Sequence, residues 1–377
     1  MRVLHISVHY NLPPGVFQQM QDEARAARTL APDVQWDTRV FAVQCEHRGE
    51  PLTLLSETPP TSVLGRLTAY VRLRLMAFAW LRRVASSYDI VLVRHGMGDV
   101  FEGWCAAQLQ NWVSVHHTHE MEEAALLGGW RSILRTRLER WSGNRVLGHA
   151  RAIIGVTGEL GRIEQARIAA PRPVFVYPNG IDLAGMPLAE DRREGPPRLL
   201  FVCSVFASWH GLESVLRALK DVKDDFVLDV VGFAYPEQRA MVAGDPRFVF
   251  HGRLKAPQIA ALTALADIGL SSFALHEKAM AEACTLKVRE YLASGLPVYA
   301  HHRDAGLPDD FRFYRNAAAA AAGLLGFAQE MRRVPRAEVR AAAAGFIDKS
   351  ALMRRLANEL DASLRADRAA TNTRKLP

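Results

Sequence analysis

The chain has 377 residues, 49% of them hydrophobic and 23% charged, and a formal net charge of +7. The length predicts about two domains, each with its own core, and the composition excludes collagen, low-complexity scaffolds and a disordered chain. The positive charge indicates an anionic partner, for which nucleic acid, an acidic membrane surface and a phosphorylated small substrate are all candidates. Lysines are scarce among the 47 basic residues, so a lysine at a chemically meaningful position carries extra weight.

Short β-branched runs alternate with amphipathic stretches along the chain. In the first half, strands are predicted at 2–8, 38–43, 90–93, 113–117, 152–156 and 174–177, and helices at 16–30, 63–85, 100–110, 131–149 and 159–168. In the second half, strands are predicted at 198–204, 226–232, 248–251, 267–271 and 297–300, and helices at 211–222, 236–243, 257–266, 286–294, 317–333 and 350–366. This alternation predicts parallel sheets with helices on both faces.

Between the halves, the polar segment 189–197 ends in Gly-Pro-Pro, which is typical of a linker. We therefore expect an α/β protein with two doubly wound, Rossmann-like domains, at 1–185 and 198–345, that face a cleft. Ligands of such sheets bind at the carboxyl ends of the strands, so the chemistry is expected there.

The sequence also bears on location and on cysteine chemistry. Four cysteines lie far apart with no C-x-x-C pair, a pattern that indicates neither a disulfide framework nor a zinc site: Cys45, Cys105, Cys203 and Cys284. The strand-like start shows no signal-peptide pattern, and no window of 18 apolar residues is free of charge. We expect a protein of a reducing, cytoplasmic compartment.

The stretch 64–84 carries five arginines among Leu, Tyr, Phe, Met and Trp. Two interpretations stay open. A basic amphipathic helix can lie on an anionic membrane surface. Alternatively, the helix packs on the sheet just before strand 90–93 and points its arginines outward, which the spread of its charges around the helix favours.

The most informative segment surrounds Glu290. Thr285 is placed to cap the N-terminus of a helix that Gly295 ends. Lys287 and Glu290 are three residues apart and so share a face beside that N-terminus, where free N–H groups and the helix dipole favour a phosphate. A carboxylate one turn on can accept the hydroxyls of a ribose. Glu282 precedes the helix, where it could meet a sugar. The alternative is an ordinary surface ion pair between Lys287 and Glu290.

In spacing and order, Glu282-x7-Glu290 followed by Gly-Leu-Pro-Val at 295–298 resembles the donor site of the retaining GT-B glycosyltransferases of the group 1 type. Segments 177–182, 250–253 and 266–270 are similar to further parts of that family. For the end of the chain, the resemblance implies that residues 346–377 form a helix that packs back on the N-terminal domain.

The resemblance implies transfer of a sugar from a nucleoside-diphosphate-sugar to the hydroxyl of a saccharide or a lipid-linked saccharide, in polysaccharide or glycolipid synthesis. No cofactor or metal is expected. The protein would be cytoplasmic, with an anionic membrane face as a candidate partner, and nucleic acid is not expected.

The resemblance also assigns roles to residues. It implies that Glu290 holds the ribose, that Lys287 holds the diphosphate with His210 or Arg253, and that Glu282 and His117 face the sugar. Two residues at the helix N-terminus complete the expected donor site: Thr285 and Leu286. The segment 203–211 departs from the family, because His210 stands in place of a lysine and an arginine is missing. Either Lys287 and the helix terminus carry the phosphate charge, or His210 is a weaker, pH-dependent contact.

Three histidines and a carboxylate lie close together at 116–120. They could bind a metal, but His116 and His117 follow a strand and point to opposite faces, so one site cannot easily use them all. The resemblance favours His117 at the active site, with His119 and Glu120 as alternatives. On the same side, Gly15 ends a loop, 11–15, that resembles the family's cleft loop.

Absent motifs narrow the function further. There is no D-x-D pair, which favours a metal-independent enzyme, and neither a P-loop nor a G-x-S-x-G motif occurs. Two alternatives remain. One is a sugar-nucleotide epimerase of the same fold, and the other is a non-catalytic nucleotide-sugar-binding or nucleic-acid-binding protein, against which the dispersed arginines argue.

Overall fold

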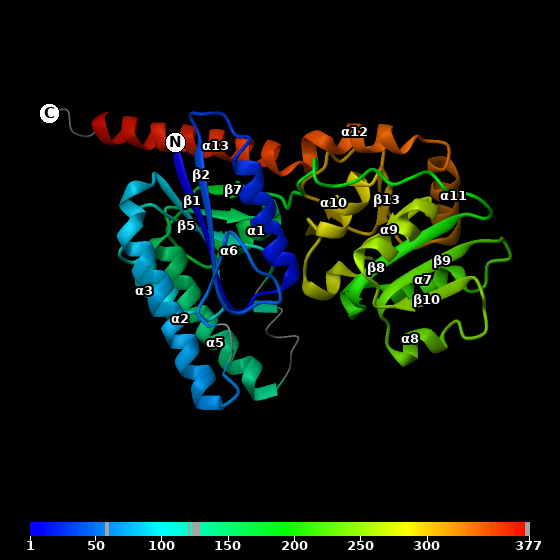
Figure 1. The fold of residues 1–377 in the computed structure, drawn as a ribbon, viewed down its shortest axis with the longest axis horizontal. Coiled ribbons are helices and arrows are strands. Elements are labelled where there is room, and N and C mark those ends of the chain that lie inside the picture. Colours follow the sequence, from blue (N-terminus) through cyan, green and yellow to red (C-terminus); the bar gives the residue numbers. More distant parts are fainter. Residues whose placement is uncertain (57–59, 120, 123–128, 374–377) are drawn as a thin grey trace. The chain divides into compact units, whose positions relative to one another are not determined.

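The computed structural model describes residues 1–56, 60–119, 121–122 and 129–373 (Figure 1). Internal contacts divide the chain into two compact units. Unit 1 comprises Met1–Pro178 and Lys349–Pro377, and unit 2 comprises Asn179–Asp348. Each unit is described by itself.

Unit 1 is built on a seven-stranded parallel sheet with the order β3-β2-β1-β4-β5-β6-β7. Its strands are β1 (Arg2–Asn11), β2 (Gln35–Gln44), β3 (Leu52–Leu54), β4 (Ile90–Arg94), β5 (Trp112–His116), β6 (Ala152–Gly155) and β7 (Val174–Val176). Its helices are α1 (Pro14–Ala27), α2 (Val63–Val84), α3 (Val100–Ala106), α5 (Gly129–His149), α6 (Gly158–Gln165) and α13 (Lys349–Thr373), with a 3-10 turn at Ala85–Ser87. Every connection between these parallel strands crosses over, as a doubly wound fold requires.

Alternate residues of the unit 1 strands bury their side chains on opposite faces of the sheet. Leu4 and Ile6 pack in one cluster with α2, α3 and α5. Val3 packs in another cluster with the final helix. Because both faces are covered, the inner strands β4 and β6 are apolar at nearly every position and form continuous hydrophobic runs in the sequence. Strands β1 and β2 carry polar residues among their apolar ones.

Helix α13 returns to unit 1 and packs there through one apolar stripe: Leu352, Met353, Leu356, Leu360 and Leu364. Its first residue is buried in a charged cluster around the Glu23 carboxylate. That carboxylate accepts hydrogen bonds from His5, Trp36 and Tyr177 at 2.6, 2.8 and 3.0 Å. The Lys349 ammonium lies 3.9 Å from it. The start of α13 is thereby fixed against α1 and the end of β7.

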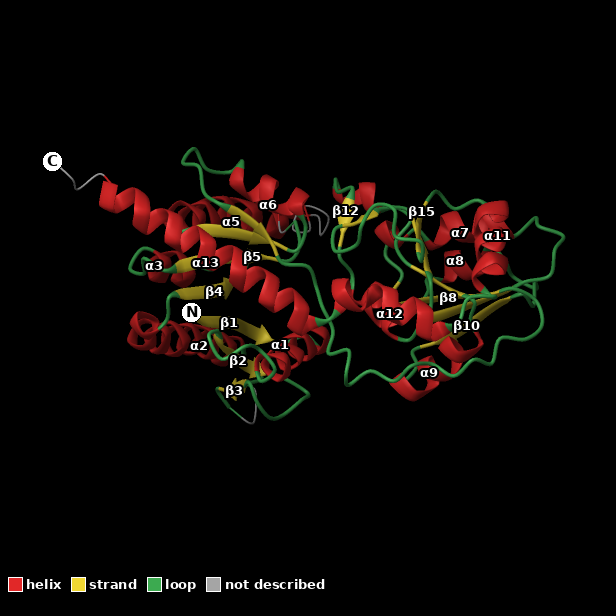
Figure 2. Cartoon of the chain, turned by 90° about the horizontal axis from the view of Figure 1, so that it is seen from above, coloured by secondary structure: helices red, strands yellow, loops and turns green. Residues whose placement is uncertain are grey.

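Unit 2 contains a six-stranded parallel sheet with the order β10-β9-β8-β11-β13-β15, and a separate pair, β12-β14. Its strands are β8 (Arg198–Val205), β9 (Val227–Phe233), β10 (Phe248–Gly252), β11 (Ile268–Leu270), β12 (Glu282–Ala283), β13 (Val298–Ala300), β14 (Arg303–Asp304) and β15 (Tyr314–Asn316). Its helices are α7 (Leu212–Leu219), α8 (Pro236–Ala240), α9 (Ala256–Leu265), α10 (Leu286–Ala293), α11 (Ala321–Met331) and α12 (Arg336–Ile347), with 3-10 turns η2 (Ser208–His210) and η3 (Leu275–Lys278). Figure 2 shows five of these helices, α7, α8, α9, α11 and α12, around the sheet.

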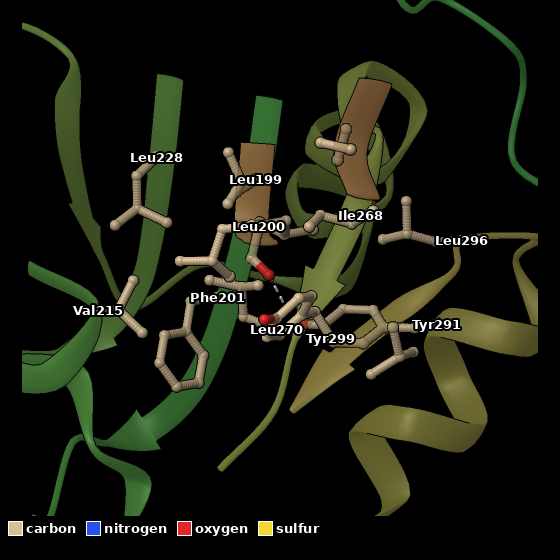
Figure 3. Packing of buried hydrophobic residues seen from close by; sticks show 14 of the residues in the cluster. Leu199, Leu200, Phe201, Val215, Leu228, Ile268, Leu270, Tyr291, Leu296 and Tyr299 are labelled. Carbon is tan, nitrogen blue, oxygen red and sulfur yellow. Dashed lines mark hydrogen bonds between the residues drawn. The ribbon is translucent and has the colours of Figure 1, made fainter. Parts of the chain in front are cut away.

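Helix α10 is held against the sheet by Tyr291, which lies in the core shown in Figure 3. Its hydroxyl accepts a hydrogen bond from the Val202 N–H at 3.0 Å and donates one to the Leu200 carbonyl at 3.3 Å. A Cβ on Gly269 would come within 2.4 Å of the Tyr291 ring, so only glycine lets the ring approach β11 so closely. The position of α10 on β8 and β11 is therefore well defined.

The predicted α/β class with two Rossmann-like sheets is confirmed. The sequence missed the short strands β3, β12, β14 and β15 and the alanine-rich helix α12. The predicted linker at 189–197 was wrong. The Ala189 N–H donates a hydrogen bond to the Ser294 carbonyl, and the Arg192 N–H donates one to the Ala264 carbonyl, so this polar segment is bound along unit 2. The division between the units falls at Pro178 and Asn179.

In the described part of the chain, no helix has the length and hydropathy needed to span a membrane.

Candidate functional site

The strand order of unit 2 creates a switch point between β8 and β11. From β8 the chain continues to β9 on one side, and β11 pairs with β8 on the other side. Ligands of doubly wound sheets bind outside the carboxyl ends of the strands at such a point. The residues predicted for donor binding can therefore be located relative to β8 and β11.

Helix α10 begins at this switch point. Its N-cap residue is Thr285, as predicted, but the hydroxyl makes no capping hydrogen bond and lies 3.4 Å from the Ser271 hydroxyl at the end of β11 instead. Leu286, also predicted at the site, is the first helical residue and is half-buried. Gly295 ends the helix with φ +77, as predicted, and a Cβ there would come within 2.5 Å of the Arg336 carbonyl.

Lys287 points back from α10 toward β8. Its ammonium donates a hydrogen bond to Cys203 Sγ at 2.7 Å and lies 5.4 Å from the centre of the Phe201 ring. Cys203 is a buried residue of β8. The lysine is thus held by soft, uncharged partners, which leaves its positive charge available at the strand ends.

His210 lies in η2, just beyond the end of β8. Burial, together with the ammonium charges of Lys287 and Lys278, lowers the pKa of His210 to about 3. Its Nδ1 atom is buried and has no hydrogen-bond partner in the structure. The alternative of a pH-dependent phosphate contact is therefore not supported for the unbound protein, because a histidine with this pKa stays neutral at neutral pH.

Lys278, in η3, is a cation that the sequence analysis missed. Its ammonium lies 4.2 Å from the centre of the Trp209 ring, and its side chain is buried. The two turns meet because Phe273 N–H bonds the His210 carbonyl at 2.9 Å, and because Gly211, at φ +69, has no Cβ to clash with Phe273. The scarcity of lysine was the one signal that could have singled out Lys278.

The two glutamates differ in their surroundings. Glu290 is exposed on α10, whereas Glu282 is buried in β12 and accepts a hydrogen bond from Arg303 Nη1 at 2.9 Å. Between them, Arg289 is fully buried and makes two hydrogen bonds to Asp304, at 2.7 and 2.6 Å. This buried pair ties α10 to β14, and so fixes where the neighbouring glutamates lie.

Arg253 is not brought to this cluster by any contact of the described residues. It is exposed and follows β10, the edge strand, which β9 separates from β8. At about 4.8 Å per strand, β10 lies roughly 10 Å from β8. The structure thus joins Lys287, Lys278 and His210, and leaves Arg253 apart.

Unit 1 has its own switch point, between β1 and β4, and a cavity of about 330 Å³ lies there. Its lining comes from the ends of β1, β4 and β5 and from α2: Val8, His9, Tyr10, Tyr70, Arg74, Arg94, His95, Gly96, Met97, His117 and Thr118. Both ring nitrogens of His117 and the Tyr10 hydroxyl are buried without a hydrogen-bond partner. Polar groups in this arrangement can bind a polar ligand.

Burial, assisted by nearby positive charge, lowers the pKa of the histidines of this cavity. Burial, Arg94 and Arg74 lower the pKa of His9 to about 3. Burial and Arg94 also hold the pKa of His117 well below its ordinary value. Both imidazoles are therefore neutral at neutral pH and can donate or accept a hydrogen bond without adding charge.

Beneath the cavity lies a buried charged network that the sequence analysis missed. His95 contacts Glu102 at 2.9 Å and Glu139 at 3.1 Å, and Arg167 contacts Glu139 at 2.8 Å. Burial by itself would lower the pKa of His95, but the Glu102 and Glu139 carboxylates raise it well above its usual value. The carboxylates also accept from the Gly96 and Gly98 N–H groups, at 2.8 and 2.7 Å. The network therefore shapes the loop that lines the cavity.

The neighbouring histidines of the segment 116–120 do not line the cavity with His117. His116 is buried on the opposite side, bonded to Ser114 at 2.9 Å and packed on the His95 ring at 4.8 Å, as the strand alternation predicts. His119 is half-buried and does not line the cavity, and Glu120 lies outside the described residues. Among the described residues, no group of three or more His, Cys, Asp or Glu side chains could hold a metal ion.

Gly15 does not lie in a loop. Helix α1 already begins at Pro14, because proline at the first helical position has its φ preset and needs no N–H partner. Gly15 is therefore an exposed residue of the first turn.

Two Rossmann-like units, each with a parallel sheet and a switch point, are the architecture of the GT-B fold class. One family model, described as glycosyl transferases group 1, matches residues 196–349, and a second, described as glycosyltransferase family 4, matches residues 28–184. Together the matches span both units, and the chain belongs to the GT-B glycosyltransferases of the group 1 type. A comparison with curated protein sequences gives no significant match.

Solved structures show the same fold. Anabaena HepE in complex with UDP-glucose superposes with a TM-score of 0.63 at 15% identity, over 96% of this chain and 100% of that one. Sucrose-phosphate synthase from Thermosynechococcus elongatus gives 0.62 at 17% identity, over 96% and 99%. WaaG, a glycosyltransferase involved in lipopolysaccharide biosynthesis, gives 0.61 at 16% identity, over 95% and 99%. At these identities the likeness concerns the fold alone.

Proposed function

We propose that this glycosyltransferase is a retaining enzyme that moves a sugar from a nucleoside-diphosphate-sugar to the hydroxyl of a saccharide or lipid-linked saccharide acceptor. The observation that carries the proposal is the cluster of Lys287, Lys278 and the α10 N-terminus at the unit 2 switch point. Two cations and a helix N-terminus are suited to a diphosphate. HepE, named with bound UDP-glucose, supports the choice of donor.

In this proposal Lys278 takes over the charge that the family pattern places on the missing arginine and on the lysine at position 210. The neutral His210 offers a hydrogen bond rather than a charge. Glu290, exposed one turn from Lys287, accepts the ribose hydroxyls. Glu282 faces the sugar, with Arg303 holding its carboxylate in place. Because two lysines supply positive charge, the reaction is proposed to need no metal, and activity in excess EDTA should equal activity without it.

The proposed reaction breaks the bond between the sugar C1 and the phosphate oxygen, and forms a bond from C1 to the acceptor oxygen on the same face. The acceptor proton goes to the departing phosphate oxygen, so no protein nucleophile is required. Stabilisation of the leaving diphosphate by Lys287 and Lys278 would be the main catalytic contribution. His117, in the unit 1 cavity, is proposed to contact the sugar through an uncharged imidazole.

The biological setting is part of the proposal. WaaG is named for lipopolysaccharide biosynthesis, and a related role in polysaccharide or glycolipid synthesis at the cytoplasmic side of a membrane would suit this chain. Its product would be a sugar-extended acceptor with unchanged anomeric configuration at C1.

A thermal-shift panel of UDP-, GDP- and ADP-sugars tests donor binding, because a bound donor raises the melting temperature by mass action. In the Glu290→Ala variant, the donor should no longer raise the melting temperature. In the Glu282→Gln variant, the donor should still raise it, but the rate of sugar transfer should fall. The matched control is Glu237→Gln, an exposed glutamate on α8. A variant that lacks both site glutamates and still transfers sugar at the parental rate would refute the proposal. Isomerisation of the donor without acceptor would instead identify an epimerase.

A further inference from the structure

The outward face of one helical layer in unit 1 combines exposed apolar side chains with arginines. This layer consists of α2, α3 and α5, and we call its outward face the α2–α3–α5 surface. The three helices pack their inner sides in a single core cluster on one side of the sheet, and Figure 1 shows them next to one another. The surface is therefore a single layer rather than three separate patches.

Direct contacts make the surface continuous. The Arg82 guanidinium of α2 lies 4.9 Å from the centre of the Trp104 ring on α3. Gly103 of α3 packs so closely on α5 that an added Cβ would come within 3.4 Å of the Arg145 side chain. In the loop before α3, Gly98 approaches Leu138 of α5 in the same way, at 3.3 Å.

Exposed apolar side chains concentrate on this surface. Of the thirteen large hydrophobic side chains that are exposed among the described residues, ten belong to α2, α3 and α5. The most exposed of them, from 59% to 75%, are Val63, Leu64, Leu67, Ile133, Leu134 and Trp141. Single exposed hydrophobic residues are ordinary on a protein surface, but a gathering of this kind marks an interaction site.

The charge of the surface is of one sign. Among the side chains that the structure describes, α2 and α5 each expose four arginines, including Arg66 and Arg72 on α2 and Arg137 and Arg140 on α5. Among the described residues of the three helices, every acidic side chain is buried, because Glu102 and Glu139 belong to the His95 network. No exposed carboxylate of these helices therefore offsets the arginines, and the surface is complementary to a layer of negative charge.

We propose that the α2–α3–α5 surface docks unit 1 on a lipid bilayer that carries anionic headgroups. A bilayer offers phosphates and hydrocarbon within about 5–10 Å of each other, which matches arginines interleaved with Leu, Ile and Trp. A nucleic acid would satisfy the arginines but would leave the aliphatic side chains in contact with water. This proposal rests on the surface alone and does not depend on the donor chemistry of unit 2.

Helix α2 packs on the sheet, as one interpretation of the stretch 64–84 expects, but Arg74 is buried beside Asp99 instead of pointing outward. In this proposal the other interpretation, contact with a membrane, applies to the same helix. Helix α2 buries Leu73, Ala77, Phe78 and Leu81 against the sheet, as a packed helix does. Its first turns, with Val63, Leu64 and Leu67, expose their apolar side chains instead.

Co-sedimentation of the full chain with vesicles tests the proposal. Vesicles of equal parts phosphatidylcholine and phosphatidylglycerol should bind it, and vesicles of phosphatidylcholine alone should bind it at least about 100-fold more weakly. Each arginine near an anionic surface contributes roughly five-fold to the affinity. The variant Arg135→Gln/Arg137→Gln/Arg140→Gln should therefore lose about 100-fold, and Leu64→Gln/Leu67→Gln/Leu134→Gln at least about ten-fold.

The matched control replaces three exposed arginines elsewhere, Arg315→Gln/Arg333→Gln/Arg354→Gln, and should bind within about three-fold of the parent, since these residues lie outside the surface. If this control variant lost as much vesicle affinity as the surface variants, the proposal would be overturned. It would also be overturned if the parent bound both kinds of vesicle equally well or bound neither. A surface that binds random duplex DNA but not vesicles would be a nucleic-acid site. A parental dimer that the leucine variant abolishes, without vesicle binding, would assign the surface to a second copy.

A measurement on the unmodified protein covers the case in which a variant does not fold. Trp104 and Trp141 are exposed on this surface, at 47% and 59%. Lipids brominated along their acyl chains should quench tryptophan fluorescence when they are mixed into the anionic vesicles. Binding without any quenching would show a purely electrostatic contact and would refute insertion of the apolar side chains.

Discussion

The two units share one architecture and differ in how their sites are assembled. In unit 2, most residues proposed for donor binding lie within the continuous segment 282–298, on or beside one helix. In unit 1, the cavity is lined from the ends of three strands and from α2, and it rests on buried charges that come from distant parts of the chain. In unit 2 the buried Arg289–Asp304 pair anchors α10, but Lys287 and Glu290 are not part of that pair. In unit 1 the cavity lies directly on buried ions, so it depends on each partner being present.

The largest expected effect follows from that dependence. Glu139→Ala leaves His95 and Arg167 buried without their shared carboxylate, so it should lower the free energy of unfolding by about 4 kcal/mol. Urea unfolding measures the change. The control Glu46→Ala removes an exposed glutamate of the same unit and should alter it by less than about 0.5 kcal/mol. Similar small losses in both variants would remove the distinction between the units.

Acid should act on unit 1 through two buried carboxylates. Burial by itself would raise the pKa of both carboxylates. His5 and Lys349 nevertheless lower the pKa of Glu23 to about 2, and His95 and Arg167 lower that of Glu139 to about 2. A carboxylate with a lowered pKa stabilises the fold above its unfolded pKa near 4.5, and that stability is lost as the pH falls through about 2. At neutral pH, the difference between the folded and unfolded pKa of each carboxylate corresponds to about 3 kcal/mol of unfolding free energy.

Unfolding free energies measured at several values between pH 6 and pH 2.5 test this dependence. The parent should lose stability as the pH falls below about 4.5, and Glu23→Gln should lose less over the same window, because it has one titrating group fewer. A variant whose stability falls as steeply as that of the parent would show that Glu23 is not responsible.

In unit 2, removal of a charge should affect activity rather than stability. Lys287→Ala should lower kcat/KM by about 100-fold and Lys278→Ala by about ten-fold, because both ammonium groups would stabilise the leaving diphosphate. The control Lys223→Ala removes an exposed lysine away from the switch point and should stay within about two-fold of the parent. A full loss of activity in Lys287→Ala accompanied by a large drop in melting temperature would contradict a role confined to the site.

The smallest expected effect compares two threonines at helix N-termini. The Thr157 hydroxyl in unit 1 accepts a hydrogen bond from the Leu160 N–H at 3.0 Å, whereas Thr285 in unit 2 makes no capping bond. Thr157→Ala should therefore cost about 1 kcal/mol of unfolding free energy, and Thr285→Ala less than about 0.3 kcal/mol. Equal costs in urea unfolding would mean that the Thr285 hydroxyl stabilises α10 after all.

Much of the secondary structure could be predicted, because its signals are local. Apolar runs marked the buried strands of both sheets, and Gly295 and Pro-rich or polar breaks marked where elements end. The misses were of two kinds. Strands such as β12 and β14, of two residues each, carry no periodic signal, and the bound segment 189–197 has the composition of a linker although hydrogen bonds hold it along unit 2.

The sequence by itself determined the alternating α/β pattern, the spacing of Glu282 and Glu290, and the shared helical face of Lys287 and Glu290. Each of these follows from the period of a helix or strand along one segment. Only the tertiary structure decided that Lys278 approaches Trp209 and His210, that Glu139 lies buried between His95 and Arg167, and that α2, α3 and α5 form one surface. Sheet order and crossover connections bring these residues together, and no local period records them.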